Sequence, residues 1–385
     1  MSELSYLEKL LDGVEVEWLP LGEITKYEQP TKYLVKAKDY HDTYTIPVLT
    51  AGKTFILGYT NETHGIYQAS KAPVIIFDDF TTANKWVDFD FKAKSSAMKM
   101  VTSCDDNKTL LKYVYYWLNT LPSEFAEGDH KRQWISNYSQ KKIPISCPDN
   151  PEKSLAIQSE IVRILNKFTA LTAELTAELN MRKKQYNYYR DQLLSFEEGE
   201  VEWKTLGDLG ENLDSKRKPI TSGLREAGSI PYYGASGIVD YVKDYIFDGD
   251  FLLISEDGAN LLARNTPIAF SISGKSWVNN HAHVIKFDSY AERRYVEYYL
   301  NSIDLSPYIS GAAQPKLNKK NLESIRIPNP SPEDKERIVS ILDKFDALTN
   351  SINEGLPREI ELRQKQYEHY RDLLFSFPKP EAASN

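Results

Sequence analysis

The stretch RKKQYNYYRDQLLSF, residues 182–196, returns as RQKQYEHYRDLLFSF at residues 363–377, with ten of fifteen positions identical. A second pair, SEIVRILNKFTALT (159–172) and ERIVSILDKFDALT (336–349), shares nine of fourteen positions. All repeated segments lie 177 to 185 residues apart and in the same order. The chain is therefore a tandem duplication, and the best-kept parts of the repeat have helical character.

The N-terminus begins inside the repeat unit. YLEKLLDGVEVEW (6–18) resembles YRDQLLSFEEGEVEW (189–203), which makes Tyr6 equivalent to Tyr189 and to Tyr370. We therefore expect the N-terminal fragment to lie beside the C-terminal helix. The predicted result is a pseudo-twofold, circular organisation of two similar halves.

Composition bounds the class of protein. The 385 residues are 41% hydrophobic and 26% charged, which suits two globular domains with connecting elements. The net charge of −8 alone argues against a nucleic-acid partner, yet residues 22–150 carry 16 Lys and Arg against 15 Asp and Glu. Cys104 and Cys147 form neither a disulfide framework nor a metal pattern, and no apolar run reaches membrane length. A cytoplasmic protein without a membrane segment is expected.

Helical spacing dominates residues 155–195. A heptad-like seam predicts helix packing, and it runs through Ile157, Ile161, Ile164, Phe168, Leu171 and Leu175. TAELTAEL (172–179) then adds a second step of four, a stutter in the coil. A helix of about 45 residues is about 68 Å long, and two such helices paired antiparallel would form a rod. In the second copy, GLP (355–357) should break or kink the helix.

The segments between the helices indicate mixed α/β domains. PVIIFDD (73–79) and DFLLISED (250–257) are candidate buried strands, while YVYYWL (113–118) and YVEYYL (295–300) are candidate amphipathic helices. We expect duplicated α+β globular domains joined by long antiparallel coiled-coil helices. The predicted divisions are 1–14 (a segment completing the repeat), 15–150 (first globular domain), 151–198 (central helical spacer), 199–330 (second globular domain), 331–378 (C-terminal helical spacer) and 379–385 (tail).

Catalytic motifs are not evident. AGKTF (51–55) lacks the upstream glycine of a phosphate-binding loop, and no Gly-x-Gly-x-x-Gly or Asn/Asp-Pro-Pro-aromatic motif is present. DFDFK (88–92) is more typical of an exposed strand than of a nuclease site. NNHAH (279–283) has histidines at i and i+2, but without a third ligand nearby we favour a structural or DNA-contact role over a metal site. No cofactor or metal is expected on this chain.

Several loops mix basic, amide and aromatic residues, which suits contacts to phosphates and base edges. A solvated surface is the ordinary explanation for any one of them, but similar loops occur in both halves. Gln133 and Gln314 fall at matching places. The candidate DNA-binding residues are Lys85, Trp86, Lys131, Arg132, Gln133, Lys141, Arg264, Asn265, Lys275, Asn279, Asn280, His281, Gln314, Lys316, Asn318 and Lys319.

The chain resembles type I restriction–modification specificity subunits along essentially its whole length. EVEWLPLGEI (15–24) and EVEWKTLGDL (200–209) resemble the openings of target-recognition domains. GAAQPKLNKKNLESIRIPNPSPEDKERIVSILDKFDALT (311–349) resembles the entry into a conserved helical region. TAELTAEL resembles the repeated tetrapeptide in the central spacer of the type IC branch. The second copy has the longer NSINEGLPREIEL (350–362) in that place, so the two helical regions are not strictly equivalent.

The resemblance implies a non-catalytic subunit whose two domains each read one half of a split, asymmetric site in double-stranded DNA. It implies two methyltransferase subunits docked on the helices and restriction or translocase subunits in a larger complex. S-adenosylmethionine, ATP and Mg²⁺ would then belong to those partners. Candidate partner-binding residues are Tyr186, Tyr189, Arg190, Tyr367, Tyr370 and Arg371, and candidate spacer-ruler residues are Thr172, Leu175, Thr176 and Leu179. The alternative is a coiled-coil adaptor that binds proteins.

Overall fold

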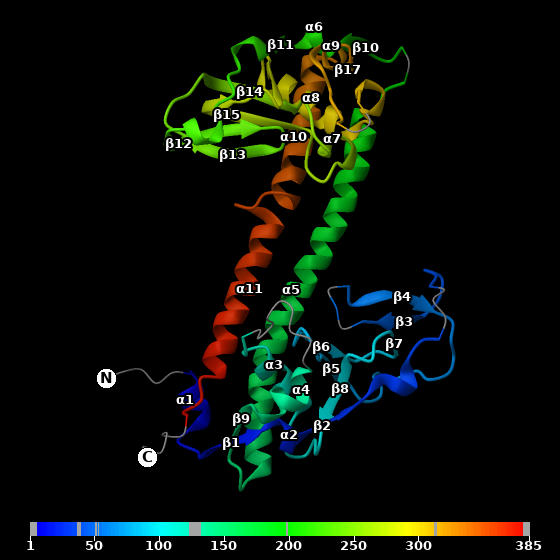
Figure 1. Ribbon diagram of the computed structural model, residues 1–385, viewed down its shortest axis with the longest axis vertical. Helices are drawn as coiled ribbons and strands as arrows, with labels where there is room; N and C mark the ends of the chain where they lie inside the picture. The colour runs from blue at the N-terminus through cyan, green and yellow to red at the C-terminus, as the bar shows by residue number, and fades with distance from the viewer. Residues whose placement is uncertain are drawn as a thin grey trace. The chain divides into compact units, whose positions relative to one another are not determined.

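The structure is a computed structural model that describes residues 6–36, 40–50, 52, 54–122, 132–197, 199–311 and 314–379 (Figure 1). The chain divides into two compact units. Unit 1 comprises Met1–Glu174 with Ile360–Asn385, and unit 2 comprises Leu175–Glu359. Each unit therefore combines one globular domain with parts of two helices that are far apart in the sequence.

Apart from a two-stranded ribbon, the described residues of unit 1 form two larger sheets. Its antiparallel sheet runs in the order β2 (Thr25–Glu28), β8 (Met98–Ser103), β5 (Val74–Asp78) and β6 (Asn84–Val87). A smaller sheet has the order β4 (Ile56–Thr60), β3 (Ile46–Leu49) and β7 (Lys92–Ala93), with β3 parallel to β7. All five residues of β5 are buried, as its continuous apolar run predicts for a central strand.

Unit 2 builds the same arrangement into one sheet. The order is β11 (Glu211–Asn212), β16 (Ala282–Lys286), β14 (Phe247–Ser255), β15 (Ala269–Val278), β12 (Ala227–Gly234) and β13 (Gly237–Val242). Here β15 takes the places of β6 and β7 together, because its start pairs with β14 and its end runs parallel to β12. The two globular domains thus share a strand topology despite their divergent sequences.

Helices in unit 1 confirm the expected closure of the chain. α1 (Tyr6–Leu11) places Leu7 and Leu11 in one hydrophobic core with Leu374, the last residue of α11 (Gly355–Leu374), and with Phe377 just beyond that helix. α3 (Leu111–Leu118) and the beginning of α5 (Pro151–Leu194) complete that core. Outside it, the indole Nε1 of Trp18 donates to the carbonyl of Pro378 at 2.9 Å. The N-terminal fragment lies beside the C-terminal helix.

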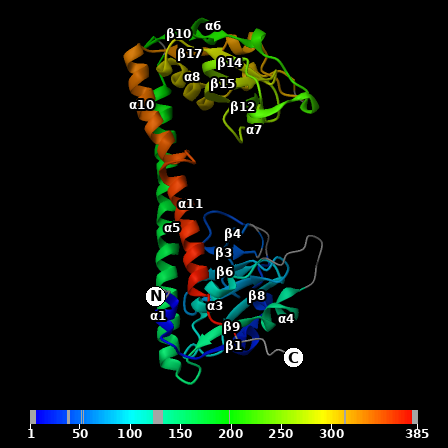
Figure 2. The ribbon, with the colours of Figure 1, turned by 90° about the vertical axis from the view of Figure 1, so that its left-hand side faces the viewer.

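In unit 2, the end of α5 packs with α10 (Pro332–Thr349) and α8 (Tyr290–Ser302), and Leu194, Leu342 and Val296 share one core. Figure 2 shows α10 and α11 running alongside α5. In unit 1, Phe168 contacts Tyr370, and in unit 2 Tyr189 contacts Phe345. The predicted α/β class with long paired helices is confirmed.

The long helices differ from expectation in two details. α5 is one helix of 44 residues, about 66 Å long, but Leu171 in the predicted seam is 38% exposed while Leu165 is fully buried. The break near GLP is confirmed, yet α10 already ends at Thr349, and Gly355 begins α11. Gly355 has φ +74°, and a Cβ there would lie 2.3 Å from the carbonyl oxygen of Ala347, so only glycine fits this turn.

Short elements complete both units. β1 (Val16–Pro20) pairs with β9 (Lys142–Ser146), and β10 (Glu202–Thr205) pairs with β17 (Arg326–Asn329). The remaining helical turns are α2 (Leu21–Ile24), α4 (Gln133–Ser136), α6 (Leu206–Leu209), α7 (Asn260–Ala263), α9 (Lys319–Glu323), η1 (Pro30–Tyr33), η2 (Tyr138–Gln140), η3 (Asp214–Lys216), η4 (Ser222–Leu224) and η5 (Ser306–Tyr308). Among the described residues, no helix combines the length and apolar character needed to span a membrane.

Candidate nucleic-acid interface and helix surfaces

The two-stranded ribbons fix which loop positions correspond. Trp18 pairs with Pro144 in unit 1, and Trp203 pairs with Pro328 in unit 2. Gln133 and Leu317 stand at the same spacing before Pro144 and Pro328, and their N–H groups donate to the carbonyls of Asp79 and Glu256. Gln133 therefore corresponds to Leu317. The predicted match of Gln133 with Gln314 is therefore wrong by three residues. Sequence similarity was too low in these loops to set the register, which the main-chain pairing determines.

In unit 1, Asp79 binds the backbone of the loop that carries Arg132 and Gln133. The backbone N–H of Gln133 donates to the carbonyl of Asp79 at 2.8 Å, and the N–H of Trp134 donates to its carboxylate Oδ1 at 2.8 Å. Trp134 is buried edge-on against Phe77, with ring centroids 4.9 Å apart. This anchoring leaves the Arg132 side chain exposed at the start of α4. Lys131 lies outside the described residues.

In unit 2, the loop from Gln314 to Lys319 is held by the segment after β14. The N–H of Leu317 donates to the carbonyl of Glu256 at 2.8 Å, and the N–H of Gly258 donates to that of Pro315 at 3.1 Å. Leu317 is buried, while the side chains of Gln314, Lys316 and Lys319 are exposed. Alternation between buried and exposed positions therefore presents polar side chains along one edge of this loop.

In unit 2, residues 279–281 lie next to the segment after β14 and the loop from Gln314 to Lys319. The imidazole of His281 lies 2.9 Å from the carboxylate of Asp257, and the backbone N–H of His281 donates to Oδ1 of Asn279 at 2.8 Å. Asn279 is buried, whereas Asn280 is exposed. The structure thus brings together five predicted contact residues from two segments, namely Asn279, Asn280, His281, Gln314 and Lys316. We call residues 256–258, 279–281 and 314–319 the loop cluster of unit 2.

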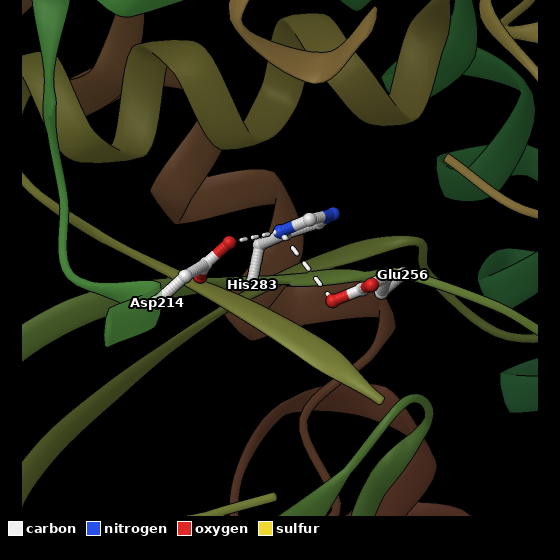
Figure 3. Close-up of side chains that lie close together, drawn as sticks. All are labelled: Asp214, Glu256 and His283. Atoms are coloured by element: carbon white, nitrogen blue, oxygen red, sulfur yellow. Dashed lines mark hydrogen bonds and ion pairs between the residues drawn. The ribbon is translucent and has the colours of Figure 1, made fainter. Parts of the chain in front are cut away.

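Glu256 and Lys316 of the loop cluster belong to a group of titratable side chains, of which Asp214, Glu256 and His283 are drawn in Figure 3. His283 Nδ1 is 2.6 Å from Asp214 and 3.8 Å from Glu256, and Nε2 is 2.7 Å from the carbonyl of Leu317. Arg217 is 3.2 Å from Asp214 and 2.7 Å from Glu256, and Lys316 is 3.1 Å from Glu256. Asp214, Glu256 and His283 have the donor types of a metal site.

The neighbouring cations argue against that role. Arg217 and Lys316 already form ion pairs with the carboxylates, and both ring nitrogens of His283 face oxygen atoms of the protein. Burial raises the pKa of Asp214, but hydrogen bonding and charge from His283 and then Arg217 outweigh it, so that pKa lies below its ordinary value. The pKa of Glu256 is likewise held low, against burial, by Arg217, His283 and Lys316. The group is an ionic support for the loop.

Other predicted DNA contacts lie elsewhere. Lys275 pairs with Asp248 near the start of β14, seven residues and about 23 Å along the strand from its end at Ser255. In unit 1, Lys85 is exposed on β6, but the indole of Trp86 lies under the ammonium of Lys112 at 3.9 Å. Packing against α3 explains Trp86 without DNA.

Four further candidates have surroundings within their own unit that account for their placement. Arg264 has φ +50° at the end of α7 and, with Asn265, lines a cavity of about 410 Å³ that also contains Tyr186 and Arg190. They therefore lie near the helix junction of unit 2. The ammonium of Lys141 lies 5.2 Å from the ring centroid of Tyr138. Asn318 caps α9, because its side chain accepts from the N–H of Asn321 at 3.0 Å.

The candidate partner-binding residues separate into two groups. Tyr186 and Tyr367 are half-buried at the junctions between helices and globular domains, and burial raises the pKa of Tyr186 to about 12. Tyr189 and Tyr370 are 46% and 45% exposed. Arg190 and Arg371 each bind the aspartate that follows them, at 2.7 and 2.8 Å. The exposed tyrosines are the better candidates for a surface that contacts another protein.

Sequence reasoning missed the residues that those tyrosines stack on. Phe168 stacks on Tyr370 with centroids 5.3 Å apart, and Phe345 stacks on Tyr189 with centroids 5.7 Å apart. Each pair joins one repeat copy to the other, and Phe168 and Phe345 occupy the same place in the repeat. The same phenylalanine in both copies could have indicated these contacts, but the sequence pattern by itself predicts only packing along the helix seam.

The helix junctions were missed as well. In unit 1 the hydroxyl of Tyr116 donates to Asn166 at 2.7 Å, and in unit 2 the hydroxyl of Tyr298 donates to Asp343 at 2.7 Å. Arg294 adds ion pairs to Asp343 and Glu297 at 2.9 and 2.6 Å. The same tyrosine thus connects helix and globular domain in each unit, with a neutral partner in one and an ionic network in the other.

The four candidate ruler residues all lie on α5. Leu175 and Leu179 are half-buried, Thr176 is exposed, and the Thr172 hydroxyl donates back to the carbonyl of Phe168 at 3.0 Å. Threonine donation of this kind slightly destabilises a helix, but α5 runs through this segment without a break. TAELTAEL is therefore accommodated as uninterrupted helix.

Comparison with known proteins agrees with this architecture. The family model "Type I restriction modification DNA specificity domain" matches residues 13–182 and again 198–362. The Escherichia coli EcoR124I/EcoR124II specificity subunit of a type I restriction enzyme is 68% identical, over all of both chains. The E. coli EcoprrI specificity subunit is 38% identical over 92% of this chain and 93% of its own. A type I restriction–modification S subunit from M. genitalium has a similar fold, with a TM-score of 0.64 at 15% identity, covering 96% of this chain and 98% of that one.

Proposed function

The chain belongs to the type I restriction–modification DNA specificity family and is a non-catalytic specificity subunit with two target-recognition domains, and from that premise we propose how its residues divide the work. Loops of the two domains contact the two halves of a split, asymmetric site in double-stranded DNA. Equivalent surfaces on the helices hold two methyltransferase subunits, to which restriction or translocase subunits add. The proposed divisions are domains at 15–150 and 199–330 and helical spacers at 151–198 and 331–378.

The observation that carries this proposal is the contrast between the two kinds of surface. The stacked pairs Phe168–Tyr370 and Phe345–Tyr189 are near copies in chemistry and geometry. The loops differ between units, with Arg132 before α4 in one and Gln314 and Lys316 before α9 in the other. Identical partners require equivalent surfaces, whereas two different half-sites require different ones.

The loop cluster of unit 2 has the chemistry that a DNA groove requires. Lys316 and Lys319 supply charge for phosphates, while Gln314, Asn280 and His281 can bind base edges. Arg132 and Gln133 take the corresponding role in unit 1. The net charge of −8 does not oppose this, because contact depends on the local surface. Lys275, at the far end of its hairpin, is assigned no base contact.

TAELTAEL serves as a ruler between the two DNA contacts in this proposal. Each tetrapeptide adds about 6 Å of helical rise and overshoots one helical turn by about 40°. Rise alone corresponds to roughly two base pairs, and twist to roughly one. We favour one, since each domain must face its groove. Leucine at every fourth position, Leu175 and Leu179, keeps the packing unit intact when a repeat is added.

Cofactors are assigned to the partners. Methylation of adenine needs S-adenosylmethionine, and cleavage that depends on translocation needs ATP and Mg²⁺, so we place these on methyltransferase and restriction subunits. Cys104 and Cys147 are unpaired, in keeping with a role in the cytoplasm.

The test is to sequence methylated adenines in DNA from a host that carries the complete system. The proposal predicts two fixed, different half-sites separated by a spacer of constant length and free sequence. A continuous recognition sequence, or methylation that does not depend on this chain, would contradict it.

A further inference from the structure

Each recognition domain has a buried acidic residue beside a buried basic residue, and the two pairs occupy equivalent positions in the sheets. Lys99 pairs with Phe77 across β8 and β5, and His283 pairs with Ile254 across β16 and β14. Two residues beyond these strand partners stand Asp79 and Glu256. Their N–H groups donate to Ala97 at 3.0 Å and to His281 at 2.9 Å, again at equivalent positions. The sheet register therefore matches Asp79 with Glu256 and Lys99 with His283.

All four side chains are withdrawn from solvent. Asp79 and Lys99 are fully buried, 3.2 Å apart, with the ammonium 4.9 Å from the ring centroid of Tyr27. His283 is 1% exposed and Glu256 is 9% exposed. Burying charge is costly unless it is paired. None of these residues except Glu256 has surface to offer to DNA, yet the acid–cation pair is present in both domains although most other residues differ.

Each pair binds the backbone of a recognition loop. In unit 1 the acid makes the contact, since Asp79 accepts from Trp134 N–H through its carboxylate and from Gln133 N–H through its carbonyl, both at 2.8 Å. In unit 2 the base makes it, since His283 Nε2 contacts the carbonyl of Leu317 at 2.7 Å. The carbonyl of Glu256 accepts from the N–H of Leu317 at 2.8 Å. Gln133 and Leu317 are the equivalent loop positions.

We infer that Asp79 and His283 are positioning residues for DNA recognition, each holding one recognition loop by its backbone and so controlling discrimination at one half-site. Lys99 forms an ion pair with Asp79, and the carboxylates of Asp214 and Glu256 lie beside Nδ1 of His283. The two domains use the same pair of positions, but the acid's side chain contacts the loop in unit 1 and the histidine's side chain contacts it in unit 2. This inference rests on the proposed DNA contact by the loops. It adds that selectivity depends on buried groups that never touch DNA.

The test compares variants that leave no uncompensated buried charge. Asp79→Leu with Lys99→Met removes the pair and the acceptor for Trp134, whereas Asp79→Asn with Lys99→Met removes both charges but keeps a side-chain acceptor. In unit 2, His283→Phe removes the contact to Leu317, and His283→Gln keeps an N–H donor. The readout is the methylated-site sequence produced by the complete complex, with its melting temperature measured alongside.

We expect the Leu/Met variant to lose about tenfold or more discrimination at positions of the first half-site only, with the Asn/Met variant close to the parent. His283→Phe should lose discrimination at the second half-site only, and His283→Gln should keep the discrimination of the parent there. Equal loss at both half-sites, or no difference within either matched pair, would overturn the inference. Arg132→Ala and Lys316→Ala serve as separate tests of the loops. If these also leave binding and methylation unchanged, the proposed DNA face itself is wrong.

Discussion

Phe168 stacks on Tyr370 with ring centroids 5.3 Å apart and planes inclined by 23°, joining the first repeat copy to the second. The reciprocal pair, Phe345 on Tyr189, has centroids 5.7 Å apart and an inclination of 28°. Tyr370 and Tyr189 remain nearly half exposed. The duplication has therefore made two similar aromatic surfaces, each of which needs both copies of the repeat.

Replacing Tyr189 or Tyr370 by serine should remove one bound methyltransferase subunit, and replacing both should remove two. The physical reason is the loss of an exposed aromatic face of a kind enriched at interfaces. Stoichiometry is measured by native mass spectrometry of the reconstituted complex. Ile352→Ser is the matched control, because Ile352 is 77% exposed between α10 and α11 without an equivalent exposed apolar twin. If the double variant still bound two methyltransferase subunits, the exposed tyrosines would not be part of the surface that binds them.

Alanine at Arg132, Gln133, Gln314, Lys316 and Lys319 should weaken DNA binding in two distinguishable ways. Lysines that contact phosphates should lower affinity for all sequences and reduce the salt slope by about one each. Arginine or glutamine that contacts a base should cost about 1–3 kcal/mol and relax one position. Lys275→Ala, at the far end of β14 and β15, should leave specificity unchanged. Unaltered binding with all five replaced would place the DNA face elsewhere.

Adding or deleting one TAEL should change the unread spacer by one base pair, or at most two, with both half-sites kept. The insertion preserves helix and leucine spacing, so the complex should still assemble. Methylation mapping at base resolution supplies the measurement. A control insertion of four residues next to the exposed helical turn η4 (Ser222–Leu224) of unit 2 should leave the spacer unaltered. A spacer that ignores TAEL number would end the ruler hypothesis.

Stability of unit 2 should fall in acid because of Asp214 and Glu256. Both have folded-state pKa values below their ordinary ones, despite burial, through His283, Arg217 and Lys316. Their contribution is thus present above the unfolded-state pKa values of about 4, and is lost as pH falls through the lower folded-state values. Denaturant unfolding between pH 6 and pH 3 should show a smaller pH slope for Asp214→Asn than for the parent. An equal slope would mean that these carboxylates are not responsible.

Much of the fold could be predicted because the two copies of the repeat share enough identical residues to be recognised from the sequence. The helical seam, the buried strands at 74–78 and 247–255, and the return of the N-terminus to the C-terminal helix all follow from repeated segments and apolar spacing. Leu171 was assigned wrongly to the seam, since periodicity gives a helix face but not where a partner helix covers it.

The candidate site was predicted only in part. Gln314, Lys316 and His281 come together as their residue types suggested, but Lys275 and Trp86 do not join them. The shared register of β8 with β5 and of β16 with β14 depends on main-chain hydrogen bonds between remote segments, which the diverged side chains do not encode. For that reason the match of Gln133 with Leu317, and the buried residues beneath them, emerged only from the structure.

The central claim is that each recognition domain reads its own half-site on a common helical frame. The most direct measurement exchanges residues 25–145 for those of a related specificity subunit and maps methylated adenines in the host genome. The account predicts that one half-site changes while the other half-site and the spacer length stay fixed. A change in both half-sites, or in neither, would contradict it.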